Sequence, residues 1–369
     1  MNLKKVKKKI NSLYVHIPFC SKICPYCDFV KVIDNYKFKD LYIKEIVKDI
    51  SFLYEKGYKF KTIYLGGGTP SILTCEQLEI LLSNLQKVIE NDHEFTIEAN
   101  PESISESKLQ IMKKYEVNRI SIGIQSFNKD ILQAINRDNS VDYFELISLV
   151  KKYIKNINVD FIYGLPNQTL EMVQEDLNNF IKLDVNHIST YSLILEEGTM
   201  FYNQGVKEIS DEECRTFYDF ILEFLIKHGF NRYEVSNFCK SGFESKHNLT
   251  YRKDEEYIAI GIGASGYVNN VRYKNSSSLS GYLKGERSIE KEVITAKDDE
   301  EYYLICNLRL KEGFNINDFK LRFNKDFAFE YKDKIAKLEK MKLVRLNEGT
   351  FRCTDEGIIL LDRVLIELI

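Results

Sequence analysis

Apolar residues are spaced in two ways between residues 13 and 195 of the chain. Short, mostly apolar runs predict buried strands, and the longer segments between them, where apolar residues recur every three or four positions, predict helices. Thr74 is the expected N-cap of the helix after the second strand, and Ser103 or Ser105 that of the helix after the third. Because at least one helix separates each strand from the next, we expect parallel pairing through right-handed crossovers. The predicted strands are Leu13–Ile17, Thr62–Leu65, Phe95–Glu98, Arg119–Gln125, Val159–Tyr163 and His187–Leu195.

This regular alternation ends near residue 200. Asp211–Lys227 predicts an amphipathic helix, and Arg232–Phe238 alternates like a strand. From about Asp298 the pattern is mainly helical, with two strands joined at Gly349 in the order typical of a winged helix. We therefore expect an α/β domain of six βα units over residues 1–200, an α+β extension over 201–297, and a smaller winged-helix-like domain over 298–369.

Several chemically unusual residues lie at the ends of the predicted strands. Six βα units can form an open partial barrel or a doubly wound open sheet, and the spacing alone allows both. In either arrangement the carboxyl ends of the parallel strands carry the functional site. The residues at or just beyond those ends are Cys20, Gly67, Glu98, Gln125 and Asp160.

Composition narrows the class of protein. The chain has 369 residues and a net charge of −3, from 52 basic and 55 acidic residues, so nothing indicates nucleic-acid binding. We interpret the basic run Lys4–Lys9 as a solvated tail rather than a contact with a membrane surface. The sequence begins without the apolar core of a secretion signal, and no apolar run is long enough for a membrane span. Together with eight cysteines, this predicts a cytoplasmic protein.

Three cysteines follow the first predicted strand with the spacing Cys20-x3-Cys24-x2-Cys27. Three thiolates can hold three corners of an iron–sulfur cubane, which leaves one iron open to a small molecule. Zinc is the alternative, but a structural zinc site normally takes four ligands. The other five cysteines are scattered singly, so His16 is the residue that could complete a zinc site.

The cysteine loop and its flanks, Tyr14–Cys20 and Pro25–Phe29, resemble the signature of the radical SAM superfamily. Within it they look like the oxygen-independent coproporphyrinogen III oxidase group, HemN and its relative HemW. The resemblance extends over essentially the whole chain and implies an open (β/α)6 TIM-like barrel. It also implies a [4Fe–4S] cluster on Cys20, Cys24 and Cys27, with S-adenosyl-L-methionine on the open iron.

The resemblance assigns further residues to the cofactor site. The turn Gly66–Pro70 resembles the element that grips the amino group of S-adenosylmethionine, and its bare backbone lets a ligand approach closely. The group's Gly-Arg-x-His becomes Asn136-Arg137-Asp138-Asn139 here, which departs from the pattern around Arg137. By resemblance, Tyr14, Tyr26, Gly67 and Glu98 line the S-adenosylmethionine site, and a second S-adenosylmethionine is associated with Gly68, Thr69, Gln125, Arg137, Asp160 and Ser192.

The segment Gly261-Ile-Gly263-Ala-Ser-Gly266 is literally G-x-G-x-x-G, a dinucleotide-binding pattern. A dinucleotide site requires a helix after the glycines, whereas the residues after Gly266 look extended. We therefore reject that interpretation. The resemblance implies instead a glycine turn that closes over the adenine, with Tyr267 nearby.

The segment His247-Asn248-x-x-Tyr251 resembles a HemW element that is suspected to contribute to haem handling. His247 would be the haem ligand, and a hydrogen-bonded structural histidine is the alternative. Arg252 replaces the tryptophan of the HemW pattern. Two features favour HemW over HemN: Phe29 stands where HemN has a fourth cysteine, and only thirteen residues precede Tyr14.

We therefore predict a haem chaperone that carries a [4Fe–4S] cluster and S-adenosylmethionine and delivers haem to recipient haemoproteins, membrane-bound ones included. The alternative is an oxygen-independent coproporphyrinogen III oxidase, so the sequence leaves open whether the protein is an enzyme. No nucleic-acid partner is expected. A monomer and a dimer formed on haem loading are both compatible with the sequence.

Overall fold

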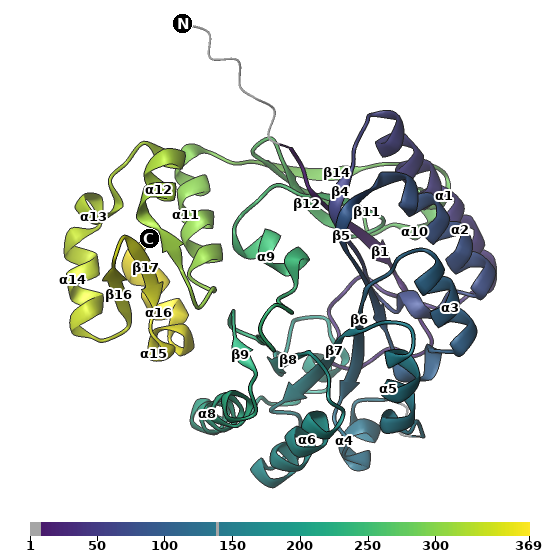
Figure 1. The fold of residues 1–369 in the computed structure, drawn as a ribbon, viewed down its shortest axis with the longest axis horizontal. Coiled ribbons are helices and arrows are strands. Elements are labelled where there is room, and N and C mark those ends of the chain that lie inside the picture. Colours follow the sequence, from purple (N-terminus) through teal and green to yellow (C-terminus); the bar gives the residue numbers. More distant parts are fainter. Residues whose placement is uncertain (1–8, 138–139) are drawn as a thin grey trace, which may run out of the picture.

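The computed structural model describes residues 9–137 and 140–369. The basic residues Lys4–Lys8 and the pair Asp138–Asn139 lie outside the described residues. At the centre is a nine-stranded sheet in the order β11-β1-β4-β5-β6-β7-β8-β10-β9 (Figure 1). Its strands are β1 (Ser12–Ile17), β4 (Phe60–Gly67), β5 (Ile89–Ala99), β6 (Arg119–Gln125), β7 (Asn156–Tyr163), β8 (His187–Ser192), β9 (Asn231–Arg232), β10 (Asn237–Cys239) and β11 (Ile258–Ile260).

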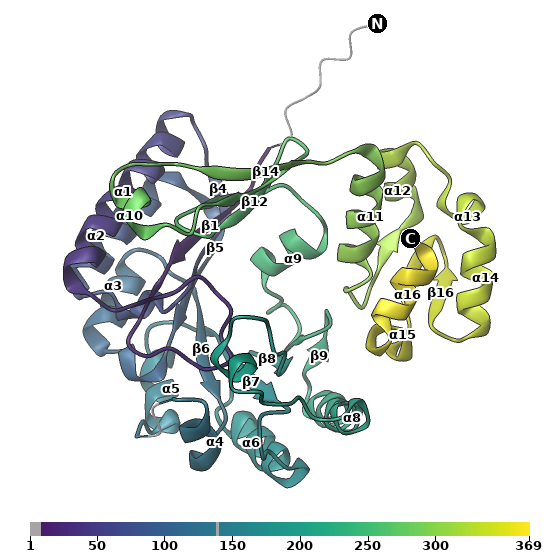
Figure 2. The same cartoon turned by 180° about the vertical axis from the view of Figure 1, so that it is seen from behind.

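Six of these strands, β1 and β4 to β8, are parallel neighbours in the order in which they occur in the chain. A doubly wound sheet reverses its strand order at a switch point, so this sequential order excludes that alternative. The two end strands, β11 and β9, are not paired with each other, and the curved sheet is therefore open. The helices that connect the strands lie along its outer face (Figures 1 and 2). They are α1 (Tyr36–Glu55), α2 (Cys75–Leu85), α3 (Glu106–Lys114), α4 (Lys129–Ala134), α5 (Tyr143–Lys151) and α6 (Leu170–Lys182).

Side chains of the parallel strands alternate between the two faces of the sheet. In β6, Ile120, Ile122 and Ile124 belong to the hydrophobic core under the helices, whereas Arg119 and Ser121 occupy the opposite, concave face. We call this concave face the lumen. It is polar, because inward positions on neighbouring strands carry hydrogen-bonding side chains, many of which bond to one another. They include Ser12, Tyr14, His16, Thr62, Tyr64, Glu94, Glu98, Asn158, Asp160, His187 and Ser189.

Of the two predicted caps of α3, Ser105 is confirmed, because its hydroxyl accepts the Lys108 N–H while Ser103 ends a single 3-10 turn. One local prediction is wrong. The segment Arg232–Phe238 forms two short strands, β9 and β10, rather than one. The Glu234 carboxylate accepts the N–H of Ser236 at 2.8 Å, and this bond turns the chain between β9 and β10.

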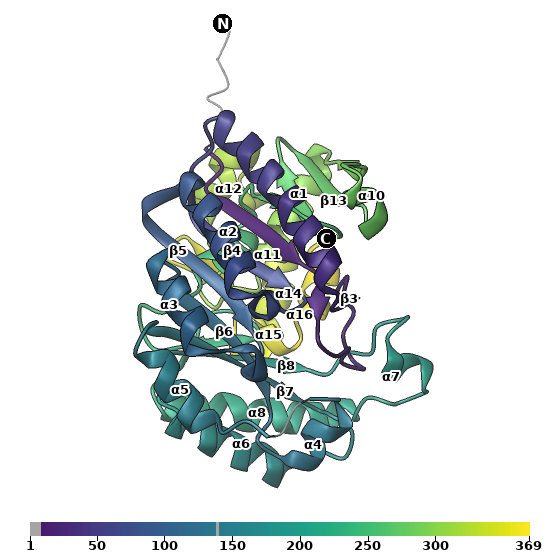
Figure 3. The ribbon, with the colours of Figure 1, turned by 90° about the vertical axis from the view of Figure 1, so that its right-hand side faces the viewer.

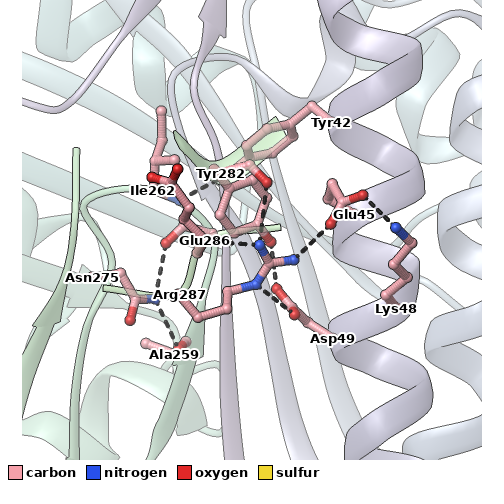
Figure 4. A network of polar contacts seen from close by, with 11 residues as sticks. Tyr42, Glu45, Lys48, Asp49, Ala259, Ile262, Asn275, Tyr282, Glu286 and Arg287 are labelled. Carbon is pink, nitrogen blue, oxygen red and sulfur yellow. Dashed lines mark hydrogen bonds and ion pairs between the residues drawn. The ribbon is translucent and has the colours of Figure 1, made fainter. Parts of the chain in front are cut away.

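The extension folds back so that β11 pairs parallel with β1. A polar clamp on α1 holds this segment (Figure 4). Arg287 bonds to Asp49 at 2.9 Å, and the Tyr42 hydroxyl accepts the Ile262 N–H at 3.0 Å. The same hydroxyl donates to the His16 carbonyl at 2.9 Å. The elements of the extension are α7 (Met200–Asn203), α8 (Asp211–Lys227), α9 (Lys246–Arg252), β12 (Ser265–Val268), β13 (Val271–Asn275), α10 (Leu279–Leu283) and β14 (Ile289–Val293).

The last part of the chain packs around a second hydrophobic core, in the helix–strand–strand–helix order predicted for a winged helix. It stands beside the barrel, with α9 between them (Figures 1 and 2). Arg322 on α12 donates to buried Asp254, just after α9, at 2.6 Å. Among residues 9–137 and 140–369, no helix combines the length and apolarity that crossing a membrane requires. The elements are α11 (Ala296–Asn307), β15 (Phe314–Asn315), α12 (Ile316–Phe323), α13 (Phe327–Glu330), α14 (Lys332–Lys340), β16 (Val344–Asn347), β17 (Thr350–Cys353), α15 (Asp355–Ile359) and α16 (Leu361–Leu368).

Candidate cofactor site

The three cysteines lie on the loop after β1, at the carboxyl end of the barrel strands. Cys20 ends the two-residue strand β2 (Phe19–Cys20), which pairs with β3 (Val32–Ile33) and so fixes both ends of the loop. The Cys27 N–H donates to the Cys24 carbonyl at 3.2 Å, which folds the tip of the loop. The α7 segment braces it from the side, through the Phe201 N–H and the Pro25 carbonyl at 2.9 Å (Figure 3).

The thiols differ in their surroundings. Cys20 is buried, whereas Cys24 and Cys27 are half-buried. Burial raises the pKa of Cys20, the hydrogen bond from the Thr69 hydroxyl at 3.7 Å opposes that rise, and the nearby Cys27 and Cys24 thiols add to it. In the described parts of the chain, no three His, Cys, Asp or Glu side chains have the spacing of a single-ion site. A cubane instead spreads three thiolates over three irons.

His16, which could complete a zinc site, is engaged in other contacts. Its Nε2 is 2.7 Å from the Val30 carbonyl, which can only accept, so Nε2 carries the proton. Nδ1 then accepts from the Tyr14 hydroxyl at 3.0 Å. With both ring nitrogens bonded, His16 ties the far end of the cysteine loop to β1 and is not a free fourth ligand.

A cavity of about 420 Å³ opens beside the cysteine loop. It brings together four of the residues predicted from the sequence: Tyr14, Gly67, Glu98 and His247. These come from three barrel strands and from α9, so the cavity joins the glycine turn to the His-Asn-x-x-Tyr segment. The other lining residues are His16, Asp28, Phe29, Val30, Tyr64, Asn248, Tyr251, Tyr257, Gly263, Ala264, Ser265 and Lys274.

The glycine turn after β4 is fitted closely against the cysteine loop. Gly67 has φ +111°, and a methyl group there would lie 2.3 Å from the His16 ring. The Gly68 N–H donates to the Ile17 carbonyl, and the Thr69 N–H to the Phe19 carbonyl, both at 2.8 Å. Only a residue without a side chain fits at Gly67, because the His16 ring occupies the space that a side chain would fill.

Glu98, at the end of β5, bonds to both sides of this turn. Its carboxylate accepts the Gly67 N–H at 3.0 Å and the Tyr64 hydroxyl at 2.7 Å. Burial raises the pKa of Glu98 to about 7, the Tyr64 hydrogen bond opposes the rise, and the charge of Asp160 adds to it. The carboxyl group therefore changes protonation near neutral pH and suits a ribose hydroxyl or an ammonium group.

A second polar group lies beside Cys20. Arg137 donates to the Tyr26 hydroxyl at 3.0 Å and to the carboxamide oxygen of Asn100. Asn100 in turn donates at 3.2 Å to Thr69, whose hydroxyl donates to the Cys20 sulfur. The Arg137 Nε and the Gln125 Oε1 are buried atoms with no hydrogen-bond partner within the described residues. Such orphaned atoms mark where a bound group would be satisfied.

Three more of the predicted residues belong neither to the cavity lining nor to the hydrogen-bonded group around Arg137. Asp160 faces the lumen and accepts from Ser121 at 3.2 Å. Ser192 ends β8 and is half-buried. Tyr267 lies in β12 and its hydroxyl donates to Asp299 on α11 at 3.3 Å, so it contributes to the contact with the last domain.

His247 is fully buried and both of its ring nitrogens are bonded. Thr62 already donates to Ser12, so its oxygen accepts from Nδ1 at 2.7 Å, and Nε2 accepts from the Tyr251 hydroxyl at 2.7 Å. Burial lowers the pKa of His247 to about 3. An iron at Nε2 would have to displace the Tyr251 hydroxyl.

Sequence reasoning missed Tyr64 and Asn100. Tyr64 donates to Glu98 and stacks on His247, with ring centroids 5.2 Å apart and planes inclined by 26°. Its signal was the period-two alternation of β4, which places Tyr64 on the lumen side, next to the glycine turn. Asn100 follows Glu98 by two positions, but its bond to Arg137 depends on a segment far along the chain.

The G-x-G-x-x-G segment is held by the α1 clamp. Gly261 has φ +96°, and a methyl group there would lie 2.6 Å from the Tyr42 hydroxyl. The last two residues of the motif already belong to strand β12, and β13 is the next element, where a dinucleotide site would have a helix. The prediction that the residues after Gly266 are extended is confirmed by this strand.

Comparisons with known proteins identify the class. Residues 14–180 match the family model of the Radical SAM superfamily, and residues 294–360 match that of the HemN C-terminal domain. The solved structure of coproporphyrinogen III oxidase (HemN) from Escherichia coli has a TM-score of 0.85 with 22% identity, covering 98% of this chain and 90% of that one. At this identity the likeness concerns the fold. Fold and cysteine loop together define a protein of the radical SAM superfamily.

Curated relatives identify the family within this superfamily. Heme chaperone HemW from Lactococcus lactis subsp. lactis is 41% identical over 362 residues, 95% of each chain. Heme chaperone HemW from Bacillus subtilis is 34% identical over 367 residues, 95% of this chain and 97% of that one. The chain belongs to the HemW family.

Proposed function

We propose that this protein is a haem chaperone, which binds haem and delivers it to haemoproteins. The observation that carries the proposal is its 41% and 34% identity, along almost the whole chain, to two relatives named heme chaperone HemW. Coproporphyrinogen III oxidation is supported by a likeness of fold at 22% identity, and the proposed cofactor residues would serve either function. The chaperone function is therefore the better supported of the two.

The cysteine loop would hold a [4Fe–4S] cluster through Cys20, Cys24 and Cys27. When bound, such a cluster supplies an open iron and a low-potential electron. The chain's own contribution is positional. The β2–β3 pair and the His16–Val30 bond fix the two ends of the loop, and the Thr69 hydroxyl supports the Cys20 sulfur.

The cavity would hold S-adenosylmethionine against the open side of the cluster. Gly67 lines the cavity without a side chain, Glu98 offers an acceptor for a ribose hydroxyl, and Tyr14 lines the same cavity. Tyr26 supports this site indirectly through its hydrogen bond with Arg137.

We place a second anionic group, such as the carboxylate of a further S-adenosylmethionine, at the polar group formed by Thr69, Gln125 and Arg137. This placement is supported by the space around Gly123. A Cβ added there would lie 2.9 Å from the Gln125 side chain and 3.5 Å from the Arg137 side chain, so these two side chains lie close together over Gly123. Gly68 adjoins them, Asp160 pairs with Gly123 between β6 and β7, and Ser192 would act from the end of β8. His247 remains a predicted haem ligand that must first give up its bond to Tyr251.

We also propose that the chain consists of three domains, residues 1–200, 201–297 and 298–369. The second hydrophobic core and the family match at residues 294–360 support this division. A reducing compartment such as the cytoplasm suits eight cysteines that are all free. Haem and the haemoproteins that receive it are the partners we propose, and we propose that the dimer, where it forms, follows haem loading.

Anaerobic reconstitution tests the proposal. The wild type should bind about four irons and four sulfides per chain, as one [4Fe–4S] cluster requires. Cys24→Ala should lose the iron and sulfide. Cys75→Ala is the matched control, because it removes a half-buried thiol on α2, and it should keep them. The wild type should also take up haem, followed by absorption, and transfer it to apomyoglobin used as a probe.

The alternative function is tested with the same material. The protein is incubated without oxygen with coproporphyrinogen III, S-adenosylmethionine and a reductant. Formation of protoporphyrinogen IX would overturn the chaperone proposal, as would a failure of the reconstituted protein to bind haem.

A further inference from the structure

The helix α9 forms one wall of the cavity and is firmly docked there. The Glu94 carboxylate accepts the N–H groups of His247 and Lys246 at 2.9 and 3.0 Å. The His247 ring is held between Thr62 and Tyr251, and it stacks on Tyr64. With backbone and side chain both bound to the barrel, α9 is a fixed part of the cavity.

Asn248 is the polar side chain on α9 that these contacts leave unused. Its backbone N–H donates to the Ser245 hydroxyl at 3.3 Å. Its carboxamide lines the cavity, is half-buried, and has no hydrogen-bond partner within residues 9–137 and 140–369. Since the fold does not use this group, a ligand in the cavity is the partner it can serve.

The carboxamide has the chemistry to recognise an adenine. It presents one donor and one acceptor in a single plane, and asparagine pairs in this bidentate way with the 6-amino group and a ring nitrogen of adenine. Tyr251, Tyr257 and Phe29 line the same cavity and offer aromatic faces for a base. A neutral carboxamide has no such match to the sulfonium or the carboxylate of S-adenosylmethionine, which favour charged partners.

We infer that Asn248 recognises the adenine edge of S-adenosylmethionine, which makes the His-Asn-x-x-Tyr segment part of the S-adenosylmethionine site. The inference rests on the proposed cofactor site. It also explains the bonding of His247, because a histidine locked by Thr62 and Tyr251 fixes α9 and thereby places Asn248 and the Tyr251 ring in the cavity wall.

Binding to the reconstituted protein tests the inference through affinity alone. Equilibrium dialysis is carried out with labelled S-adenosylmethionine and with its purine analogue, which lacks the 6-amino group. The wild type should prefer S-adenosylmethionine by roughly tenfold, the loss expected for one bidentate contact to a base. In Asn248→Ala this preference should fall close to one, because the affinity for S-adenosylmethionine falls and that for the analogue changes little.

The controls separate recognition from folding. Asn178→Ala, on the exposed face of α6, should behave as the wild type. Asn248→Asp keeps an acceptor for the 6-amino group but lacks the amide donor to the ring nitrogen, so it should keep the preference while its affinity for both ligands falls. Circular dichroism and iron content should stay unchanged, since the side chain has no partner within the described residues.

Each outcome decides one claim. If the wild type binds no S-adenosylmethionine, the proposed cofactor site is wrong. If the wild type binds it and Asn248→Ala keeps the tenfold preference, the adenine inference is wrong. An equal loss of affinity for both ligands in Asn248→Ala would show a structural role for Asn248 and would likewise overturn the inference.

Discussion

Replacing Glu98 with glutamine should stabilise the cofactor-free protein at alkaline pH. Burial raises the pKa of the Glu98 carboxyl from about 4.5 to about 7. Because the folded-state pKa lies above the unfolded one, the folded protein holds an extra proton in this window, and stability falls as the pH rises from 4.5 to 7. A carboxamide does not ionise, so Glu98→Gln should lack this loss.

The magnitude follows from the same values. The rise of the Glu98 pKa from about 4.5 to about 7 means that the folded protein loses on the order of 3 kcal/mol of stability once the carboxyl is ionised. Glutamine keeps one acceptor for the Gly67 N–H or the Tyr64 hydroxyl but loses the other, which costs about 1 kcal/mol. The variant should therefore gain about 2 kcal/mol over the wild type at pH 8 and nothing at pH 5.

Urea unfolding of both proteins without cofactors, at one-unit steps from pH 5 to pH 8, measures this difference. Glu223→Gln, an exposed position on α8, serves as the matched control and should follow the wild type at every pH. A stability gap for Glu98→Gln that stays constant across the series would refute the argument from burial. Binding should move in the opposite direction, since the variant loses an ionisable acceptor for S-adenosylmethionine.

Three further substitutions test the frame around the site. Gly67→Ala should destabilise the protein by about 2 kcal/mol or more, through backbone strain and contact with the neighbouring imidazole, and should abolish S-adenosylmethionine binding. Gly57→Ala is the control: Gly57 has φ +78°, but a Cβ there would meet nothing within 4 Å, so its loss of stability in urea unfolding should come from backbone strain alone and be smaller. A loss equal to that of Gly67→Ala would contradict the steric argument. Tyr42→Phe should cost about 1–3 kcal/mol, because the Ile262 N–H loses its partner; an unchanged unfolding midpoint would count against the clamp. Arg322→Met should lower the stability by about 3 kcal/mol and speed proteolysis between the domains, because Asp254 stays buried with fewer partners. An unchanged rate of proteolysis would contradict a role of this ion pair in holding the domains together.

The strands and helices of the barrel followed from local patterns. Apolar runs and the capping residue Thr74 were confirmed because burial of a strand face and capping of a helix are decided within a few residues. The single strand predicted after Arg232 was wrong for an equally local reason, because a turn held by Glu234 breaks it. Ser103 and Ser105 both had the chemistry of a cap, and the structure decided between them.

The sequence by itself determined the three-cysteine loop, the glycine turn and the carboxylate at the end of a strand, because a parallel sheet collects its strand ends at one edge. Tertiary structure decided what surrounds them. It brought Asn248 and Tyr251 from a helix far along the chain into the same cavity, locked His247 on both nitrogens, and raised the pKa of Glu98 to about 7. Those properties depend on burial and on contacts between distant segments, which no spacing along the chain contains.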